Sequence, residues 1–224
     1  MKYWRFLVFI ILLSTGCRDK VDPPYFGFEY YGWQEGKFVT YEVFDIFHDA
    51  DLSPSSDTNH YILKTVVGET IIDNEGREAN KLYRYSYDYE TGELLDLRVW
   101  NGILADSRGE LVEENQRIIR MVFAITREKT WNINAFNTKE EDEAHYKDIH
   151  SEKTINGIHF DSTVTVEYED FFSLIDDIKR YDVYAKDVGL VKRSYKDLVI
   201  QNFDTLDIQY GTELYYNLID YGVE

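Results

Sequence analysis

From residue 36 to the end of the chain, apolar and β-branched residues alternate with polar ones in short runs. Turns with Gly, Asn or Asp follow every 8–12 residues, which is typical of antiparallel strands. The clearest run is Lys81–Tyr89, where Tyr83, Tyr85, Tyr87 and Tyr89 fall on one face of a strand. The predicted strands are Phe38–Phe47, Tyr61–Val67, Thr70–Ile72, Lys81–Tyr89, Leu94–Leu104, Arg117–Ile125, Lys153–Phe160 with an Asn156-Gly157 hairpin, Ser162–Tyr168, Tyr181–Ala185, Leu190–Ile200 and Leu214–Tyr221.

These ten or eleven strands predict a mainly β fold with a single antiparallel domain over residues 31–224. A strongly curved sheet, a half-open barrel or a sandwich would each satisfy the pattern. Phe171–Lys179 carries apolar residues at helical spacing and predicts a short helix, whereas the acidic Thr138–Tyr146 could be a helix or a sheet edge. Asp49–Asn59 predicts a long loop within the domain.

The first sixteen residues have a different pattern. Lys2 and Arg5 precede the unbroken apolar run Phe6–Leu13, and the small residues Ser14–Gly16 follow it. This order is typical of a secretory signal peptide, predicted here over residues 1–16. The run is too short for a bilayer-spanning helix, which needs about 20 apolar residues. A short buried helix is the alternative interpretation.

Cys17 is the single cysteine and directly follows the small residues. Leu13–Cys17 resembles the lipobox of bacterial lipoproteins, although Ser14 stands where that pattern prefers Leu. The resemblance implies that the Cys17 thiol receives a diacylglyceryl group and that further acylation, for example with palmitate, anchors the protein to a membrane. Residues 17–30 are then a lipidated tether, and Arg18 rather than Asp after the cysteine implies the outer membrane of the cell envelope. Ordinary secretion with a free Cys17, or with Cys17 lost, is the alternative.

Charge narrows the choice of partners. The 224 residues include 24 Lys and Arg against 42 Asp and Glu, so the formal net charge is −18. That excess of acid disfavours nucleic acid as a partner and disfavours docking on anionic lipid through basic patches. Aromatic residues make up 16% of the chain, which is too many for a disordered acidic segment.

A second resemblance covers most of the body of the chain. Four segments resemble those of a loose group of Gram-negative exported β-sheet lipoproteins. They are Gly36–Val43, Lys129–Trp131, Asn156–Asp161 and Val183–Val191. Val183–Val191 is similar to a closing hairpin of exported families that include lipoprotein carriers with a half-open barrel. The matching residues are turn and core residues, so the resemblance implies a fold and no chemistry.

Catalytic patterns are absent from the sequence. There is no Gly-x-Ser-x-Gly motif, the five histidines lack His-x-x-x-His spacing, and the glycines stand singly at turns. We therefore expect no catalytic residue, no metal site and no cofactor. Acid pairs could flank a glycosidic bond or hold calcium, but in so acidic a chain we expect them to lie mostly on solvated faces; they are Glu113-Glu114, Glu140–Glu143 and Asp176-Asp177.

Aromatic side chains are the main candidates for ligand binding. The ladder Tyr83, Tyr85, Tyr87 and Tyr89, with Trp100 on the returning strand, could stack on sugar rings or line an apolar groove. The alternative is structural, because cross-strand aromatic pairs stabilise sheets without any ligand.

These observations predict a lipid-anchored, non-enzymatic binding or assembly module of the cell envelope, with a glycan, a lipid or an envelope protein as its partner. One alternative is a carrier or chaperone for lipid or another apolar ligand in a curved-sheet pocket. Another is a polysaccharide-acting enzyme with a carboxylate pair, and a third is a structural accessory of a membrane complex. Whether the sheet encloses an open cavity or a filled core separates these alternatives best.

Overall fold

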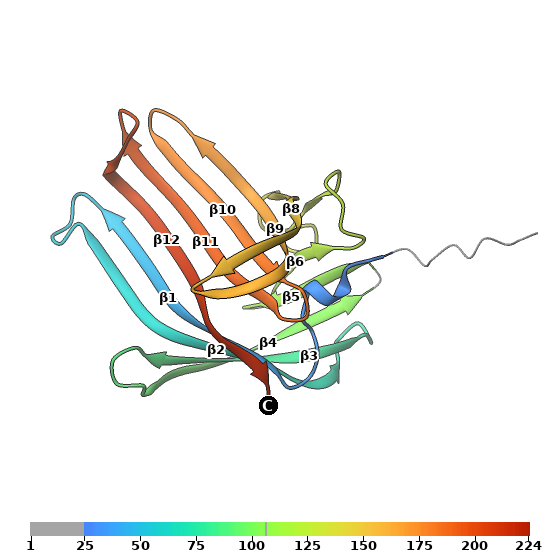
Figure 1. The fold of residues 1–224 in the computed structure, drawn as a ribbon. Helices are drawn as coiled ribbons and strands as arrows, with labels where there is room; N and C mark the ends of the chain where they lie inside the picture. The colour runs from blue at the N-terminus through green and yellow to red at the C-terminus, as the bar shows by residue number, and fades with distance from the viewer. Residues whose placement is uncertain (1–24, 106) are drawn as a thin grey trace, which may run out of the picture.

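The computed structural model describes residues 25–105 and 107–224 (Figure 1). The predicted signal peptide and Cys17 lie outside these residues. The described chain forms one antiparallel sheet of twelve strands in the order β6-β5-β4-β3-β2-β1-β12-β11-β10-β9-β8-β7. The strands are β1 (Lys37–Asp49), β2 (Ser56–Ile72), β3 (Glu78–Asp88), β4 (Leu94–Ala105), β5 (Arg108–Glu113), β6 (Gln116–Val122), β7 (Thr130–Asn132), β8 (Glu143–Ile155), β9 (Ile158–Phe172), β10 (Asp176–Ala185), β11 (Gly189–Gln201) and β12 (Asp204–Val223).

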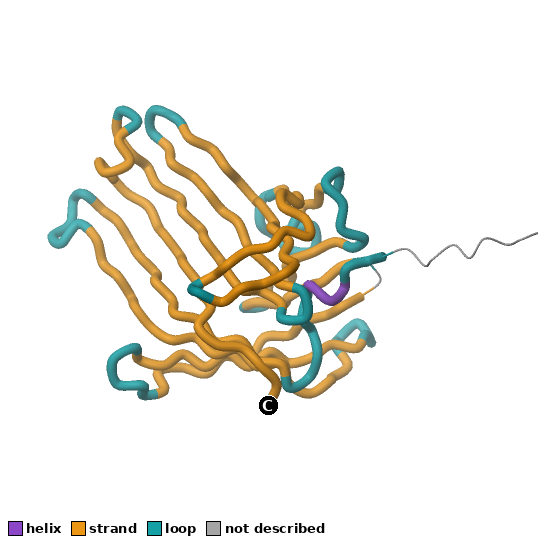
Figure 2. Tube along the Cα trace, viewed as in Figure 1, coloured by secondary structure: helices purple, strands orange, loops and turns teal. Residues whose placement is uncertain are grey.

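The sheet curls until its two edge strands, β6 and β7, approach each other, which makes a nearly closed barrel with an unsealed seam (Figure 2). A few hydrogen bonds replace the missing ladder across the seam. The backbone N–H of Ile119 donates to the carbonyl of Ile133 at 3.0 Å, and the Trp131 indole donates to the carbonyl of Ile119 at 3.1 Å. The Tyr146 hydroxyl bonds to both the N–H and the carbonyl of Val122, at 3.0 and 2.8 Å.

The predicted fold class is confirmed, because the chain is one strongly curved antiparallel sheet. The Asn156-Gly157 hairpin is also confirmed, and both residues have the positive φ that a type I′ turn requires. Two predicted runs, Tyr61–Val67 and Thr70–Ile72, belong to one strand, β2, with a shift of register between Val67 and Thr70.

The predicted helix over Phe171–Lys179 is wrong. Phe172 ends β9, Asp176 begins β10, and the Ser173 hydroxyl accepts hydrogen bonds from the N–H groups of Ile175 and Asp176 in the turn between them. Leu174 and Ile175 are exposed at the tip of this hairpin, so their spacing marks no buried helical face. Thr138–Tyr146 is likewise not a helix, because it runs from a loop into β8.

The predicted loop over Asp49–Asn59 is shorter in the structure, because β1 ends at Asp49 and β2 begins at Ser56. The only helix of the described residues is the short 3-10 helix η2 (Phe28–Tyr30).

An N-terminal strap, residues 25–36, closes the end of the barrel at which β1 begins. Tyr30 lies within the predicted tether, yet its side chain is fully buried and its hydroxyl hydrogen-bonds His150 Nδ1 and Ser162 Oγ, both at 2.6 Å. Two clusters of buried apolar side chains hold the sheet together. One lies under the strap and along the seam, and the other lies where β1, β12, β11 and β10 meet the β8–β9 hairpin.

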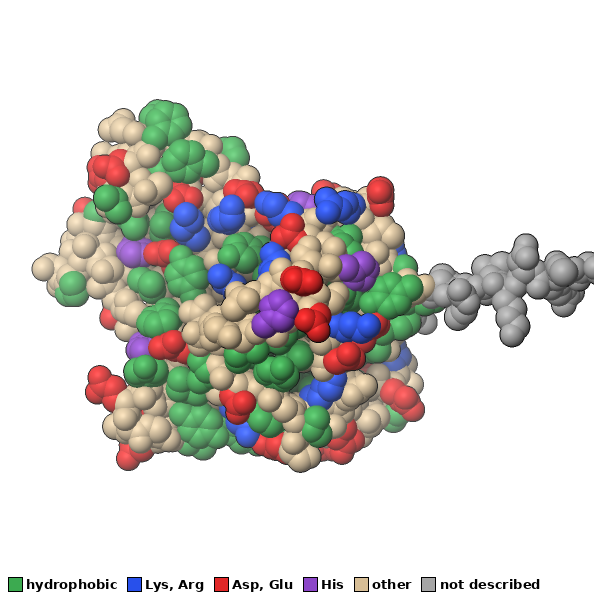
Figure 3. Space-filling model, in the orientation of Figure 1, with side chains coloured by type: hydrophobic (Ala, Val, Ile, Leu, Met, Phe, Trp, Pro, Cys, Tyr) green, Lys and Arg blue, Asp and Glu red, His purple; other side chains and the backbone are tan. Residues whose placement is uncertain are grey.

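The surface carries interspersed acidic, basic and apolar side chains (Figure 3). Apolar side chains gather at the tips of the β9–β10 and β11–β12 hairpins, where Phe172 packs against Phe203 with 5.9 Å between ring centroids. No helix in the described part of the chain is long and apolar enough to cross a bilayer.

Candidate binding cavity

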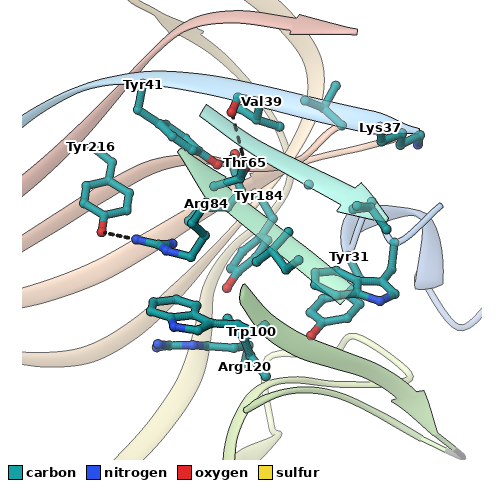
Figure 4. A pocket seen from close by; sticks show the side chains of 18 of the residues that line it. Tyr31, Lys37, Val39, Tyr41, Thr65, Arg84, Trp100, Arg120, Tyr184 and Tyr216 are labelled. Atoms are coloured by element: carbon teal, nitrogen blue, oxygen red, sulfur yellow. Dashed lines mark hydrogen bonds between the residues drawn. The ribbon is translucent and has the colours of Figure 1, made fainter. Parts of the chain in front are cut away.

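A cavity lies inside the curl of the sheet, above the N-terminal strap (Figure 4). Its volume is about 90 Å³, which is smaller than the roughly 300–1,000 Å³ of sites for drug-sized ligands. Tyr31, Gly32 and Trp33 of the strap form its floor. Apolar side chains from five strands form much of its inner wall, and they include Val39, Val67, Leu82, Leu111 and Leu190.

The cavity continues into a wider polar space of about 550 Å³. The two spaces share the residues Arg84, Trp100, Arg120, Arg193 and Tyr216. The interior is therefore apolar near the strap and polar towards the opposite end of the barrel, where it opens.

Glycines make the floor possible. A Cβ atom on Gly102 would lie 1.7 Å from Cζ2 of Trp33, and a Cβ atom on Gly109 would lie 2.7 Å from Cε2 of Tyr31. Only a residue without a side chain lets these rings lie flat against β4 and β5. The Tyr31 hydroxyl also donates to the carbonyl of Glu110 at 2.6 Å, which fixes the strap to the sheet.

Two buried ion pairs stiffen the cavity wall. The Arg193 guanidinium donates to both carboxylate oxygens of Asp182, at 2.9 and 2.8 Å, and the Tyr168 hydroxyl donates to the same carboxylate at 3.0 Å. Burial disfavours the charge on Asp182, but Arg193 outweighs it and holds the pKa of Asp182 below its usual range. Glu113 pairs with Arg120 in the same way, and its pKa is also lowered despite burial.

Arg84 differs from the other arginines of the cavity. Its guanidinium carbon lies 3.7 Å from the centre of the Trp100 ring, and Nη2 donates to the Tyr216 hydroxyl at 3.2 Å. No carboxylate of the described residues lies within 4.0 Å of its nitrogens. By contrast, an acid pairs with each of Arg98, Arg120, Arg180 and Arg193.

The structure separates the predicted aromatic platform into two parts. Trp100 is the cross-strand neighbour of Leu82, so it shares the inner face with Leu82 and Arg84 and lines the cavity. Strand alternation turns Tyr83, Tyr85 and Tyr87 to the outer face.

On that outer face, neighbouring rings of Tyr83, Tyr85 and Tyr87 stack with centroids 6.4 Å apart. Tyr89 stacks on His60 at 3.7 Å. A ligand-binding role for the tyrosines stays a prediction, and it concerns a surface that does not include Trp100.

Sequence reasoning missed the arginines of the cavity. A signal for Arg84 was present, because it alternates with the tyrosines of β3 and so faces the same side as Leu82. A signal for Arg120 was present too, because it interrupts the apolar run Ile118–Val122. A charged residue inside a predicted strand core indicates a buried partner or a site.

Several of the acids named from the sequence lie in ion pairs or hydrogen bonds. Asp177 accepts from Lys196 at 2.6 Å, Asp142 accepts from Arg180 at 2.8 Å, and Asp176 accepts from the Ser173 hydroxyl at 2.7 Å. Within residues 25–105 and 107–224, no group of three or more His, Cys, Asp or Glu side chains is placed to hold a metal ion.

No protein-family model matches the sequence. No curated protein matches it significantly either. The structure is similar to that of a predicted lipoprotein from Parabacteroides distasonis ATCC 8503, with 12% identity, a TM-score of 0.44, and coverage of 90% of this chain and 100% of that one.

It is also similar to a predicted exported protein with a YmcC-like fold from Bacteroides fragilis NCTC 9343. That match has 13% identity and a TM-score of 0.42, and it covers 84% of this chain and 96% of the other. Both likenesses are too distant to carry an argument about what this chain binds.

Proposed function

We propose that this chain is a lipid-anchored, non-enzymatic binding protein of the cell envelope, and that the cavity inside its sheet is the ligand site. The observation that carries the proposal is the cavity itself, with an apolar floor and a polar mouth in a single curved sheet. Ligand sites are concave and mostly apolar, with a few placed polar groups, and this interior has that composition.

Glycoside hydrolysis is the enzymatic alternative, and the acids of the polar space bear on it. A glycosidase needs one carboxylic acid whose pKa is raised, so that it can protonate the leaving oxygen. Asp45 borders the polar space, and burial raises its pKa, so it is the candidate acid there. Glu113 borders the same space, but Arg120 lowers its pKa against the effect of burial. Asp142, which also borders the polar space, pairs with Arg180. Reducing sugar released from envelope polysaccharides by the purified protein would favour the enzyme alternative.

A carrier for lipid or another apolar ligand is the second candidate. The specific observation that supports it is the inner end of the cavity, where Val67, Leu82 and Leu111 face the aromatic strap. Burial of apolar ligand surface there contributes about 25 cal/mol per Å².

The cavity is tested with the uncharged dye N-phenylnaphthylamine, which fluoresces on entering an apolar site. Leu111→Trp places a ring in the cavity, whereas Val112→Trp places the same ring on the other face of β5, since neighbouring residues of a strand point to opposite faces. We expect dye binding by the wild type and Val112→Trp, and at least fivefold weaker binding by Leu111→Trp. Failure of all three folded proteins to bind the dye would contradict the proposed site.

The lipid anchor rests on the sequence, since Cys17 lies outside the described residues. Two or three acyl chains make attachment effectively permanent, whereas one chain holds marginally. Mass spectrometry of the N-terminal peptide should show a diacylglyceryl group on Cys17, and globomycin should block its processing. Cys17→Ser should move the protein from the outer-membrane fraction to the soluble fraction. An unmodified Cys17 in a correctly exported wild-type protein would rule the anchor out.

A further inference from the structure

We propose that the cavity binds an anionic amphiphile, with its carboxylate or phosphate group on Arg84 and its apolar part at the inner end. The proposal rests on the proposed function, because it names the ligand class of the same cavity.

Basic residues outnumber acids in the lining of the polar space. Net charge is −18 overall, yet the polar space is lined by six basic residues and three acids. The basic residues are Arg84, Arg98, Arg120, Lys139, Arg180 and Arg193. Acids pair with Arg98, Arg120, Arg180 and Arg193, so among the described residues the lining cations without an acid partner are Arg84 and Lys139.

Arg84 is the arginine of this set that is available to a ligand. Of its five N–H donors, only one has an acceptor among the described residues, the Tyr216 hydroxyl at 3.2 Å. The guanidinium carbon lies 3.7 Å from the centre of the Trp100 ring, a cation–π contact that holds the planar fork in place. Such a fork matches a carboxylate or phosphate group with two parallel hydrogen bonds.

Neighbouring acids do not occupy Arg84. Glu113 and Asp182 face the same interior, but they are held by Arg120 and Arg193. Asp45 lines the polar space with Arg84, but it forms no ion pair with it within 4.0 Å. An unpaired cation in a partly buried site is costly unless it is compensated. Stacking on Trp100 offsets part of that cost, and an anionic ligand would supply the rest.

The apolar part of the ligand has a defined place beside Arg84. Leu82 lies two residues earlier on the same face of β3 and lines the inner end with Val39 and Val67. A molecule with its anionic head on Arg84 therefore directs its tail towards Tyr31 and Trp33, which close the floor. This juxtaposition of one free guanidinium and an apolar chamber favours an amphiphile over a free inorganic anion.

Displacement of N-phenylnaphthylamine by four competitors tests the inference. Dodecanoate and dodecyl phosphate carry the two anionic heads, methyl dodecanoate is the uncharged counterpart, and inorganic phosphate lacks the tail. We expect both anionic amphiphiles to bind the wild type at least tenfold more tightly than the ester, and inorganic phosphate not to compete at millimolar concentration. A stronger effect of either head identifies which anion the site prefers.

Arg84→Gln should weaken dodecanoate roughly tenfold to a hundredfold, the range of one charge-assisted hydrogen-bond pair, and leave the ester unchanged. Arg127→Gln is the matched control, because Arg127 is exposed and lines no part of the cavity; it should behave as the wild type. Circular dichroism establishes that each variant is folded.

Equal binding of dodecanoate and its ester by the wild type would overturn the inference, and this comparison needs no variant. Unchanged dodecanoate affinity in folded Arg84→Gln would overturn it as well. In both cases the dye still binds, so the proposed cavity function stands. If the wild type did not bind the dye, that result would instead contradict the proposed function of the cavity.

Discussion

At the level of single residues, buried charged side chains determine the stability of this interior and the group that is available to a ligand. Asp182 is fully buried, and its carboxylate is satisfied by Arg193 and the Tyr168 hydroxyl. A buried pair of this kind gains little over an apolar pair, but removal of one partner leaves the other charged and desolvated. The same reasoning explains why Arg84, which has no such acid, is the residue that we connect with a ligand.

Asp182→Asn should lower the free energy of unfolding by about 3–5 kcal/mol, because Arg193 then stays buried without a counter-charge. The substitution keeps the side-chain volume, so lost packing does not contribute. Urea denaturation followed by circular dichroism measures the change.

Asp96→Asn is the matched control, since Asp96 pairs with Arg98 on the surface and both side chains are about half exposed or more. It should change the free energy of unfolding by less than about 1 kcal/mol. Equal changes in the free energy of unfolding for the two substitutions would show that the buried pair contributes no more to stability than the exposed pair.

Sequence reasoning reached some of these residues and not others. The period of two in β3 is enough to place Tyr83, Tyr85 and Tyr87 on one face, and the structure shows their rings stacked there. That period does not say which face points inward, because the curl of the sheet depends on residues far away in the chain. Trp100 and the tyrosines were therefore grouped together, although β3 and β4 carry them on opposite faces.

At the level of elements, strands with strong alternation were predictable and short or irregular ones were not. Phe38–Phe47 and Leu190–Ile200 closely match β1 and β11. β5 was missed because six residues between tight turns give too short a pattern. The prediction of a helix over Phe171–Lys179 was wrong because the apolar residues of a hairpin tip, among them the exposed Leu174 and Ile175, have the same spacing as one face of a helix.

The packing of the strap against the sheet requires a residue without a side chain at Gly102 in β4. Gly102→Ala should lower the free energy of unfolding by about 1–3 kcal/mol, because the new Cβ atom would occupy the place of the Trp33 ring. Urea denaturation of Gly102→Ala, Trp33→Ala and the double variant forms a thermodynamic cycle. The cost of Gly102→Ala should largely disappear in the Trp33→Ala background, and a cost that persists would show that the clash with Trp33 is not its cause.

The Tyr146 hydroxyl provides two of the hydrogen bonds across the seam. Tyr146→Phe removes the group that satisfies both the N–H and the carbonyl of Val122, so the free energy of unfolding should fall by about 1–3 kcal/mol. Amide hydrogen exchange in β6 should accelerate more than exchange in β1, which has a neighbour on each side.

Tyr85→Phe serves as the control for the seam. Tyr85 lies on the outer ladder, where it stacks with its neighbours, so loss of its hydroxyl should cost less than about 0.5 kcal/mol. Uniform acceleration of exchange in Tyr146→Phe across the sheet would contradict a local role at the seam.

The whole molecule combines an acidic chain with an interior in which Arg84 has no acid partner among the described residues. The net charge follows directly from the composition. The fold class and the single β domain were predictable because the short strands follow from the local alternation of apolar and polar residues. It could not predict the cavity, because the space arises only where the strap, the curl of twelve strands and the glycines of β4 and β5 come together. Long-range assembly thus decides both the existence of the site and the separation of its apolar and polar ends.

The interior also sets the pH range over which the whole fold is stable. The pKa values of Asp182 and Glu113 are lowered in the folded state, although burial alone would raise them. Their contribution is therefore present above the ordinary carboxyl pKa of about 4 and is lost as the pH falls below it. Burial raises the pKa of Tyr195 to about 12. Because an unfolded tyrosine ionises near pH 10, the stability from this group is present below about pH 10 and is lost towards pH 12.

We therefore expect the urea midpoint to stay level between about pH 5 and pH 9 and to fall on both sides of that range. Urea titrations at several pH values test the acid limb, and phenolate absorbance near 295 nm follows tyrosine ionisation on the alkaline limb. In Glu113→Gln the decline below pH 4 should be shallower than in the wild type, because one of the two buried carboxyls with a lowered pKa is gone. A midpoint that rises on acidification below pH 4, or an alkaline limb on which all tyrosines ionise near pH 10 before unfolding, would contradict the assignment of these groups to a buried interior.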